Sequence, residues 1–177
     1  MRLTPFVAGS LALVSALAAC GRGGPPSGGG DLVARSTVQQ VVERGELVVL
    51  MEAQFKPFTY KEDGVLKGFD VDLARALADE LGVKVRFEER EWGMLATELL
   101  QGKGDLVISG ITATPKRALT AAFSAPYFLT RTIALVGVPS ADGITSVRQL
   151  DAPGRTVVAQ GQSTGEVAAR KHLPKAK

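Results

Sequence analysis

Cysteine and histidine are nearly absent from this sequence of 177 residues, which contains one of each, Cys20 and His172. A single cysteine excludes an intramolecular disulfide and a cysteine-based metal cluster. His172 lies in a polar segment near the end of the chain, so we expect a solvated side chain without a catalytic role. The residue types therefore predict no metal site, and no pattern in the sequence indicates a cofactor.

Concentrated charge of one sign is also missing. The formal net charge is +3, and the basic residues are spread along the chain. The sequence lacks a zinc-ligand spacing and a phosphate-binding loop. It also lacks a basic patch and a basic segment interleaved with aromatic residues, which would indicate nucleic-acid binding. We interpret the small positive charge as a solubility feature and expect no nucleic acid partner.

The N-terminal segment 1–20 has the layout of a secretory signal. Arg2 precedes an apolar run over 6–19, which is shorter than a membrane-spanning helix requires. The last four residues of the segment, LAAC, resemble the lipobox of bacterial lipoproteins. This resemblance implies that Cys20 is lipidated and that the chain is anchored to a membrane.

Segment 21–38 is predicted to be a flexible linker. It begins with GRGGPPSGGG, a run of Gly, Pro and Ser without apolar periodicity, which cannot pack a core. A folded part is therefore expected to follow the linker, on the outer side of the cytoplasmic membrane.

The segment 39–135 alternates between strand and helix patterns. Short continuous apolar runs predict strands, and apolar residues at helical spacing predict helices between them. This alternation is typical of an open parallel α/β sheet with flanking helices. In chain order we expect a helix at 38–44, a strand at 46–51, a loop at 52–67, a helix at 68–81, a strand at 83–87, a helix at 92–100, a strand at 105–109 and a helix that begins at Thr114.

The carboxyl ends of parallel strands meet at one edge of the sheet, where ligands bind in such folds. Glu52 and Phe55 follow the first predicted strand, Trp92 follows the second, and the segment SGITATPKR at 109–117 follows the third. Taken alone, Trp92 fits a core position of its helix, and Glu52 fits a solvated loop. If these segments meet at one edge of the sheet, however, an anionic group, aromatic rings and hydroxyl donors lie close together.

Arg117 lies where helix stability alone gives no reason for a cation. Thr114 is a predicted N-cap and Pro115 the first helical residue, so Lys116 and Arg117 lie at the positive end of the helix dipole. A positive charge at this end predicts an anionic ligand. Asp70 and Asp72, by contrast, lie in the first turn of a helix where the dipole favours them, so we assign them no chemistry.

The segment 136–177 is predicted to begin a second α/β lobe. Apolar runs at 132–138 and 155–160 predict strands, 144–150 predicts a short helix, and a further helix is expected from Glu166. Ser163 and Glu166 have the spacing of a capping box. Two strands are too few for a sheet with its own core, so we expect this lobe to be incomplete and the sequence to be truncated or a fragment.

Several motifs together resemble the bacterial extracellular solute-binding proteins of family 3, the polar amino acid receptors of ABC importers. The resemblance implies a type II periplasmic-binding-protein-like fold, a two-lobed clamp that closes on one amino acid by a hinge motion. The first lobe would be 39–135, and 136–177 would be the hinge and the start of the second. The motifs are PF at 57–58, GFDVDL at 68–73, GKGDL at 102–106, SGITATPKR at 109–117 and FSAPY at 123–127.

The resemblance also implies roles for individual residues. Arg117 would hold the α-carboxylate of the ligand, Phe55 and Trp92 would sandwich the ligand, and Glu52 would face its side chain. Gln162 stands at a loop position that is often glycine in the family, and the family's late acidic residue would fall beyond Lys177. The groups that would bind the amino acid backbone are Ser109, Gly110 and Thr112 from the first lobe and Ser163 and Thr164 from the second.

The implied function is binding without chemistry. We expect a monomeric receptor on the periplasmic or extracellular face of the envelope, which captures a free polar or cationic amino acid and delivers it to an ABC transporter permease. Cyclohexadienyl dehydratases resemble the same fold, but we can assign no general acid to the residues here. A sensor or cell-wall lyase module is the third possibility, although the sequence contains no further domain or membrane span.

Overall fold

The computed structural model describes residues 36–137, 139 and 141–177. The chain divides into two units at the boundary between Gln40 and Val41. The predicted signal at 1–20, the lipidation site Cys20 and most of the predicted linker lie outside the described residues. Helix α2 spans Thr37–Arg44, so it begins within the segment 21–38 that the sequence predicts to be a linker. No helix in the described ranges is long and apolar enough to cross a membrane.

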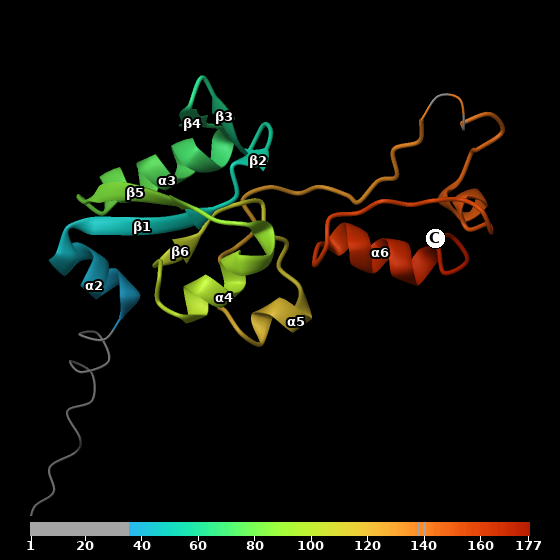
Figure 1. Ribbon diagram of the computed structural model, residues 1–177. Helices are drawn as coiled ribbons and strands as arrows, with labels where there is room; N and C mark the ends of the chain where they lie inside the picture. The colour runs from blue at the N-terminus through green and yellow to red at the C-terminus, as the bar shows by residue number, and fades with distance from the viewer. Residues whose placement is uncertain (1–35, 138, 140) are drawn as a thin grey trace, which may run out of the picture. The chain divides into compact units, whose positions relative to one another are not determined.

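A parallel three-stranded sheet forms the core of the first half of the unit Val41–Lys177 (Figure 1). It consists of β1 (Glu46–Met51), β5 (Lys84–Glu89) and β6 (Leu106–Val107), in the order β5-β1-β6. The apolar run ELVVLM forms β1 because a central strand covered on both faces needs apolar side chains at every position. All of its residues after Glu46 are buried. The predicted strand at 105–109 is real but shorter, with two residues in the ladder.

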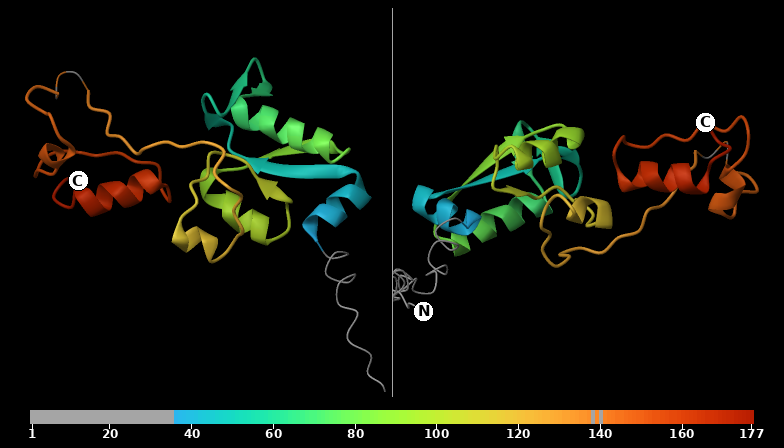
Figure 2. Two further views of the ribbon diagram at one scale, coloured as in Figure 1. Left: turned by 180° about the vertical axis from the view of Figure 1, so that it is seen from behind. Right: turned by 90° about the horizontal axis from the view of Figure 1, so that it is seen from below.

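Helices α3 (Phe69–Glu80) and α4 (Leu95–Leu100) cover opposite faces of this sheet (Figures 1 and 2). The crossovers run from β1 outward to β5 and back past β1 to β6, and right-handed crossovers in opposite directions place their helices on opposite faces. α3 buries Val71, Ala74 and Ala78 against the core at helical spacing. The predicted helix at 92–100 begins as a 3-10 turn at Trp92–Met94 and continues as α4.

A small antiparallel sheet replaces the loop predicted at 52–67. It contains β2 (Gln54–Phe55), β3 (Thr59–Glu62) and β4 (Val65–Lys67), in that order. The turn between β3 and β4 is Asp63-Gly64, and both residues have positive φ, 52° and 77°. Two such residues are characteristic of a tight hairpin turn. The loop prediction was wrong because these strands are short and largely exposed, without an apolar alternation.

The second half of the unit has helices but no strands among its described residues. The strand predicted at 132–138 is absent over 132–137, where Leu135 is 96% exposed. The strand predicted at 155–160 is also absent, although Arg155 and Val157 exchange backbone hydrogen bonds with Lys177, at 2.8 Å each. Both predictions were wrong because an apolar run becomes a strand only beside a ladder partner. Its helical elements include α5 at Pro115–Ala118, a 3-10 helix, η3, at Val147–Leu150, within the predicted 144–150, and α6 at Thr164–His172.

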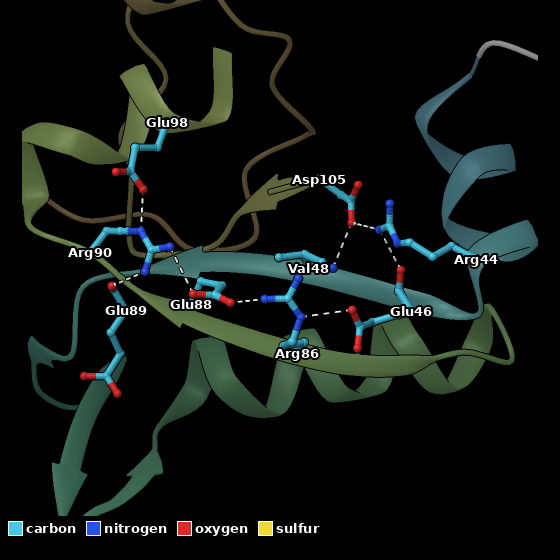
Figure 3. Close-up of polar contacts among 9 residues, drawn as sticks. All are labelled: Arg44, Glu46, Val48, Arg86, Glu88, Glu89, Arg90, Glu98 and Asp105. Atoms are coloured by element: carbon cyan, nitrogen blue, oxygen red, sulfur yellow. Dashed lines mark hydrogen bonds and ion pairs between the residues drawn. The ribbon is translucent and has the colours of Figure 1, made fainter. Parts of the chain in front are cut away.

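Charged side chains connect the strands of the parallel sheet at its surface (Figure 3). Asp105 accepts a hydrogen bond from the backbone N–H of Val48 (2.8 Å) and forms an ion pair with Arg44. Arg86 lies between Glu46 (2.9 Å) and Glu88, which come from two neighbouring strands. Exposed pairs of this kind each contribute less than about 1 kcal/mol. Asp105 matters more, because its carboxylate also satisfies a backbone donor of the central strand.

Candidate functional site

Two of the predicted site residues meet at the carboxyl edge of the sheet. Ser109, which follows β6, is buried, and its Oγ accepts a hydrogen bond from the backbone N–H of Glu52 at 3.0 Å. Glu52 directly follows β1. The hydroxyl therefore fixes the path of the chain where it leaves the central strand. Since this occupies one lone pair of Ser109, the hydroxyl keeps its proton for another partner.

Phe55 forms an exposed aromatic surface beside this edge. Its ring stacks on Phe58, with centroids 5.2 Å apart and planes inclined by 15°, and the residue is 45% exposed. The Phe55 ring also lies against Gly110. A Cβ at Gly110 would lie 2.6 Å from Phe55 Cε1, and Gly110 has φ of +58°. Glycine is therefore required at position 110 for two reasons, the left-handed backbone conformation and the close approach of the Phe55 ring.

Arg117 is held by groups from three parts of the chain. Its guanidinium lies over the Trp92 ring at 5.4 Å, and its Nη1 and Nη2 donate hydrogen bonds to the carbonyl oxygens of Thr112 and Gln162, each at 3.0 Å. Burial lowers the pKa of Arg117, but a guanidinium remains charged at any physiological pH. Trp92 and Thr112 thus meet Arg117, whereas the ring of Phe55 has other partners.

The sequence-based reason for singling out Arg117 needs correction. Thr114 is the N-cap, with Oγ1 accepting from the Arg117 N–H at 3.3 Å, and Pro115 is the first helical residue, as predicted. The helix α5 (Pro115–Ala118), however, has only four residues. Its dipole is correspondingly small, so the expected repulsion carries little weight. Arg117 also has stabilising partners, two carbonyl oxygens and an indole face, which the sequence did not reveal.

The predicted residues of the second lobe lie at the start of α6. Ser163 is its N-cap, and Ser163 Oγ accepts from the backbone N–H of Glu166 at 3.1 Å. The Glu166 carboxylate accepts from the N–H of Gln162 at 2.6 Å, so only half of the predicted capping box forms. Thr164 is the first residue of the helix. Gln162 has φ of 60°, a left-handed conformation that glycine adopts most readily.

Glu52 also has a side-chain partner from the second half of the chain. The Nε2 group of Gln160 donates to both carboxylate oxygens of Glu52, at 3.0 and 3.2 Å. An amide at both oxygens leaves further lone pairs on the carboxylate. Glu52 is therefore a charged acceptor whose current partner is neutral.

A cavity of about 380 Å³ opens beside Glu52, between the ends of β1 and β5. Four of its lining residues are glutamates, and one of them, Glu98, is nearly buried and paired with Arg90 and Lys103. The hydrogen bond from Lys103, with help from Arg90, lowers the pKa of Glu98. No three metal-ligating side chains come together within the described ranges. The lining residues are Glu52, Ala53, Gln54, Glu89, Arg90, Glu91, Met94 and Glu98.

Sequence reasoning missed Asp70 as part of the site. Asp70 is fully buried, and its Oδ2 accepts the backbone N–H of Gly110 at 2.8 Å. Burial raises the pKa of Asp70, and burial together with the Asp70 carboxylate raises the pKa of Tyr127 to about 12. The helix dipole therefore does not account for Asp70. One signal was available, because Asp70 is four residues before Ala74 and so lies on the buried face of α3.

A parallel α/β sheet with polar and aromatic residues at its carboxyl edge is typical of a ligand-binding protein. The model of the bacterial extracellular solute-binding proteins, family 3, matches residues 47–172. The chain therefore belongs to this family.

Relatives of known name include both binders and an enzyme. The chain is 32% identical to cyclohexadienyl dehydratase of Pseudomonas aeruginosa, over 80% of this chain and 53% of the relative. It is 35% identical to the arginine-binding extracellular protein ArtP of Bacillus subtilis, over 73% of this chain and 49% of the relative. The chain thus spans about half the length of these two relatives.

A solved structure of an amino acid-binding protein has the same fold. The ancestral amino acid-binding protein AncCDT-1, a precursor of cyclohexadienyl dehydratase, has a TM-score of 0.78 and 44% sequence identity, covering 80% of this chain and 63% of that one. The type II periplasmic-binding-protein fold expected from the sequence is therefore confirmed for the part that this chain covers.

Proposed function

We propose that this protein is the substrate-binding component of an amino acid ABC importer, which holds one polar or cationic amino acid without changing it chemically. Family membership supports an extracytoplasmic binder. The relatives are longer than this chain, which spans about half of their length. The ligand, the transporter permease and the monomeric state are therefore all part of the proposal.

The observation that carries the proposal is the cation held over an aromatic ring at the edge of the sheet. Arg117 lies over Trp92, and its two terminal nitrogens are directed at carbonyl oxygens. A guanidinium that donates two bonds in one plane is suited to a carboxylate, which would replace a neutral oxygen by an anionic one. We assign the α-carboxylate of the ligand to Arg117, with Ser163 and Thr164 completing this end.

The remaining groups would hold the rest of the amino acid. Ser109, Gly110 and Thr112 are assigned to its α-amino and α-carboxylate groups. Phe55 and Trp92 are assigned to the aliphatic part of the side chain, because an exposed ring such as Phe55 and a half-buried ring such as Trp92 gain from covering apolar atoms. No catalytic residue is needed in this assignment.

Glu52 favours a cationic or polar side chain. Its carboxylate borders a cavity lined by three further glutamates, and its present partner is a neutral amide. A ligand ammonium or guanidinium would form a charge-assisted bond in place of that neutral one. The name of ArtP, an arginine-binding protein, is consistent with this preference.

The location outside the cytoplasm follows from the N-terminal sequence in this proposal. Segment 1–20 would be the lipoprotein signal, cleaved before Cys20, so that Cys20 becomes the N-terminus and carries the lipid anchor. Segment 21–38 would be the tether. Segment 39–135 would be the first lobe, and 136–177 the hinge and the start of the second lobe. Metabolic labelling with a fatty acid, compared with a Cys20→Ser variant, tests the anchor directly.

A thermal-shift screen of the full-length protein against the standard amino acids tests the function. We expect stabilisation by one or a few polar or cationic amino acids, because a ligand that binds only the folded state raises the melting temperature. Calorimetry then gives the affinity for each hit. If no amino acid stabilises the protein, the proposed function is wrong.

A dehydratase is the second candidate function, because the matched relative from Pseudomonas aeruginosa has that name. Such an enzyme would bind a carboxylated ring compound in the same clamp and would require a placed general acid. Incubation of the full-length protein with prephenate or arogenate distinguishes the two candidates. Product formation would support the enzyme, and binding of an amino acid without turnover of either compound supports the receptor.

A further inference from the structure

The start of helix α3 connects two loops that carry candidate site residues. The backbone N–H groups of Phe69 and Asp70 donate to the carbonyl oxygens of Pro57 and Phe58, at 3.2 and 3.0 Å. The first N–H groups of a helix have no partner within the helix, so these two are satisfied by the turn between β2 and β3. Gly68 permits the approach, since a Cβ there would lie 2.1 Å from the Phe58 oxygen.

The side chain of Asp70 makes the second connection. Its Oδ2 accepts the N–H of Gly110 at 2.8 Å, from a loop forty residues later in the chain. The Tyr127 hydroxyl lies close enough to the same carboxylate for the Asp70 charge to help raise the pKa of Tyr127. Asp70 thus holds two loops. Its backbone N–H holds the turn beside Phe55, and its side chain holds the loop that contains Ser109 and Gly110.

The two connected loops also touch each other directly. The ring of Phe55 lies against Gly110, which leaves no room for a side chain, and Phe55 stacks on Phe58. A shift of Gly110 would therefore move the aromatic surface as well. It would also move Ser109, whose hydroxyl fixes the backbone of Glu52.

We propose that Asp70 is a positioning residue of the ligand site, which holds the 109–110 turn and the Phe55 ring in the geometry that binds the ligand. Asp70 is fully buried and does not itself touch the ligand in this proposal. The inference rests on the proposed function, because it concerns the same site. Beyond that function, we infer that a buried carboxylate without contact to the ligand controls the affinity of the site for the amino acid.

Asp70→Asn in the full-length protein tests this inference, with Asp72→Asn as the matched control. Both changes remove one negative charge from the first turn of α3, but the Asp72 side chain is 73% exposed and paired only with Arg75 among the described contacts. The amide is a weaker acceptor for the Gly110 N–H than the carboxylate. We expect Asp70→Asn to weaken amino acid binding about tenfold or more, and Asp72→Asn to leave it unchanged.

Hydrogen exchange separates positioning from general stability. In Asp70→Asn we expect the amide of Gly110 to exchange at least tenfold faster, while the amides of Val49 and Leu50 in β1 keep their protection. If affinity falls only together with protection in β1, Asp70 has a general structural role and the inference is wrong. Wild-type affinity in Asp70→Asn would equally overturn it.

Tyr127→Phe provides a second variant in case Asp70→Asn does not fold. It removes only the hydroxyl at the Asp70 carboxylate, and we expect a two- to fivefold loss of affinity with faster exchange at Gly110. Unchanged affinity and exchange in this variant would then reject the inference. If the wild-type protein binds no amino acid, the proposed function fails, and exchange at Gly110 alone decides whether Asp70 holds this turn.

Discussion

Arg117→Ala is expected to remove most of the affinity for an amino acid and to leave the fold intact. The guanidinium contacts two backbone carbonyl oxygens and the face of Trp92, and none of these contacts belongs to the buried core. Thr112 and Gln162, which supply the two oxygens, are exposed. Water can therefore replace the lost donors.

The two expected effects differ in size. Loss of the cation–π contact and of two exposed hydrogen bonds lowers the free energy of unfolding by about 1 kcal/mol. A hydrogen bond between charged partners contributes about 1.5–3 kcal/mol, so loss of the bond to the ligand carboxylate weakens binding about 10- to 150-fold. The N-cap remains, because Thr114 accepts from the backbone N–H of Arg117 rather than from its side chain.

Calorimetric titration of the amino acid found in the thermal-shift screen measures the change in affinity. Lys116→Ala is the matched control, since Lys116 precedes Arg117 in the same short helix, has the same charge and is exposed. We expect this control to bind as the wild type does. Equal affinities for Arg117→Ala and wild type would refute the assignment of Arg117 to the ligand carboxylate.

Three further predictions concern selectivity, stability and pH. Glu52→Gln should lower the ratio of affinities for arginine over glutamine about tenfold in competition titrations, and an unchanged ratio would separate Glu52 from the ligand side chain. Gly68→Ala should lower the free energy of unfolding in urea by about 2 kcal/mol or more, because its Cβ would lie 2.1 Å from a carbonyl oxygen. Gly102→Ala, with φ of +71° and no atom within 4 Å, should cost only about 1 kcal/mol, and equal costs would contradict the close approach. Burial raises the pKa of Asp70 above its ordinary 3.8, so the folded state keeps the carboxyl proton to a higher pH than the unfolded chain does. Ionisation of Asp70 therefore lowers the free energy of unfolding as the pH rises through the interval between the unfolded-state pKa and the raised folded-state pKa. The stability of the wild type relative to Asp70→Asn should therefore fall over that interval in urea titrations, and a relative rise would refute the raised pKa.

The elements of the first lobe that could be predicted are those with a long repeating pattern. The helix at 68–81 and the strand at 46–51 are found within one residue of their predicted bounds. The apolar spacing of the helix reflects burial on one face, and the continuous apolar run of the strand reflects burial on both. The small sheet at 54–67 has no such pattern. Its one available signal was the dipeptide Asp63-Gly64, a strong hairpin indicator between two short runs.

The contacts of the site were harder to predict than its members. Glu52 and Ser109 could be placed at one edge from strand order alone, and their hydrogen bond follows from that placement. The contact between Asp70 and Gly110 could not be predicted, because Asp70 already had a sufficient local explanation in the first turn of a helix and Gly110 was assigned to the ligand. The strand predictions at 132–138 and 155–160 were wrong for a related reason. A strand depends on a partner strand that is distant in the sequence, and a short stretch of sequence does not reveal it.

The order β5-β1-β6 has a consequence for the newly made chain. Synthesis proceeds from the N-terminus, so β1 is complete before either of the strands that flank it, and β6 is the last to arrive. Until then ELVVLM is an apolar segment with strand propensity and two free edges, the kind of segment that starts aggregation. Folding of this chain therefore depends on keeping these six residues apart from other chains until the sheet forms around them.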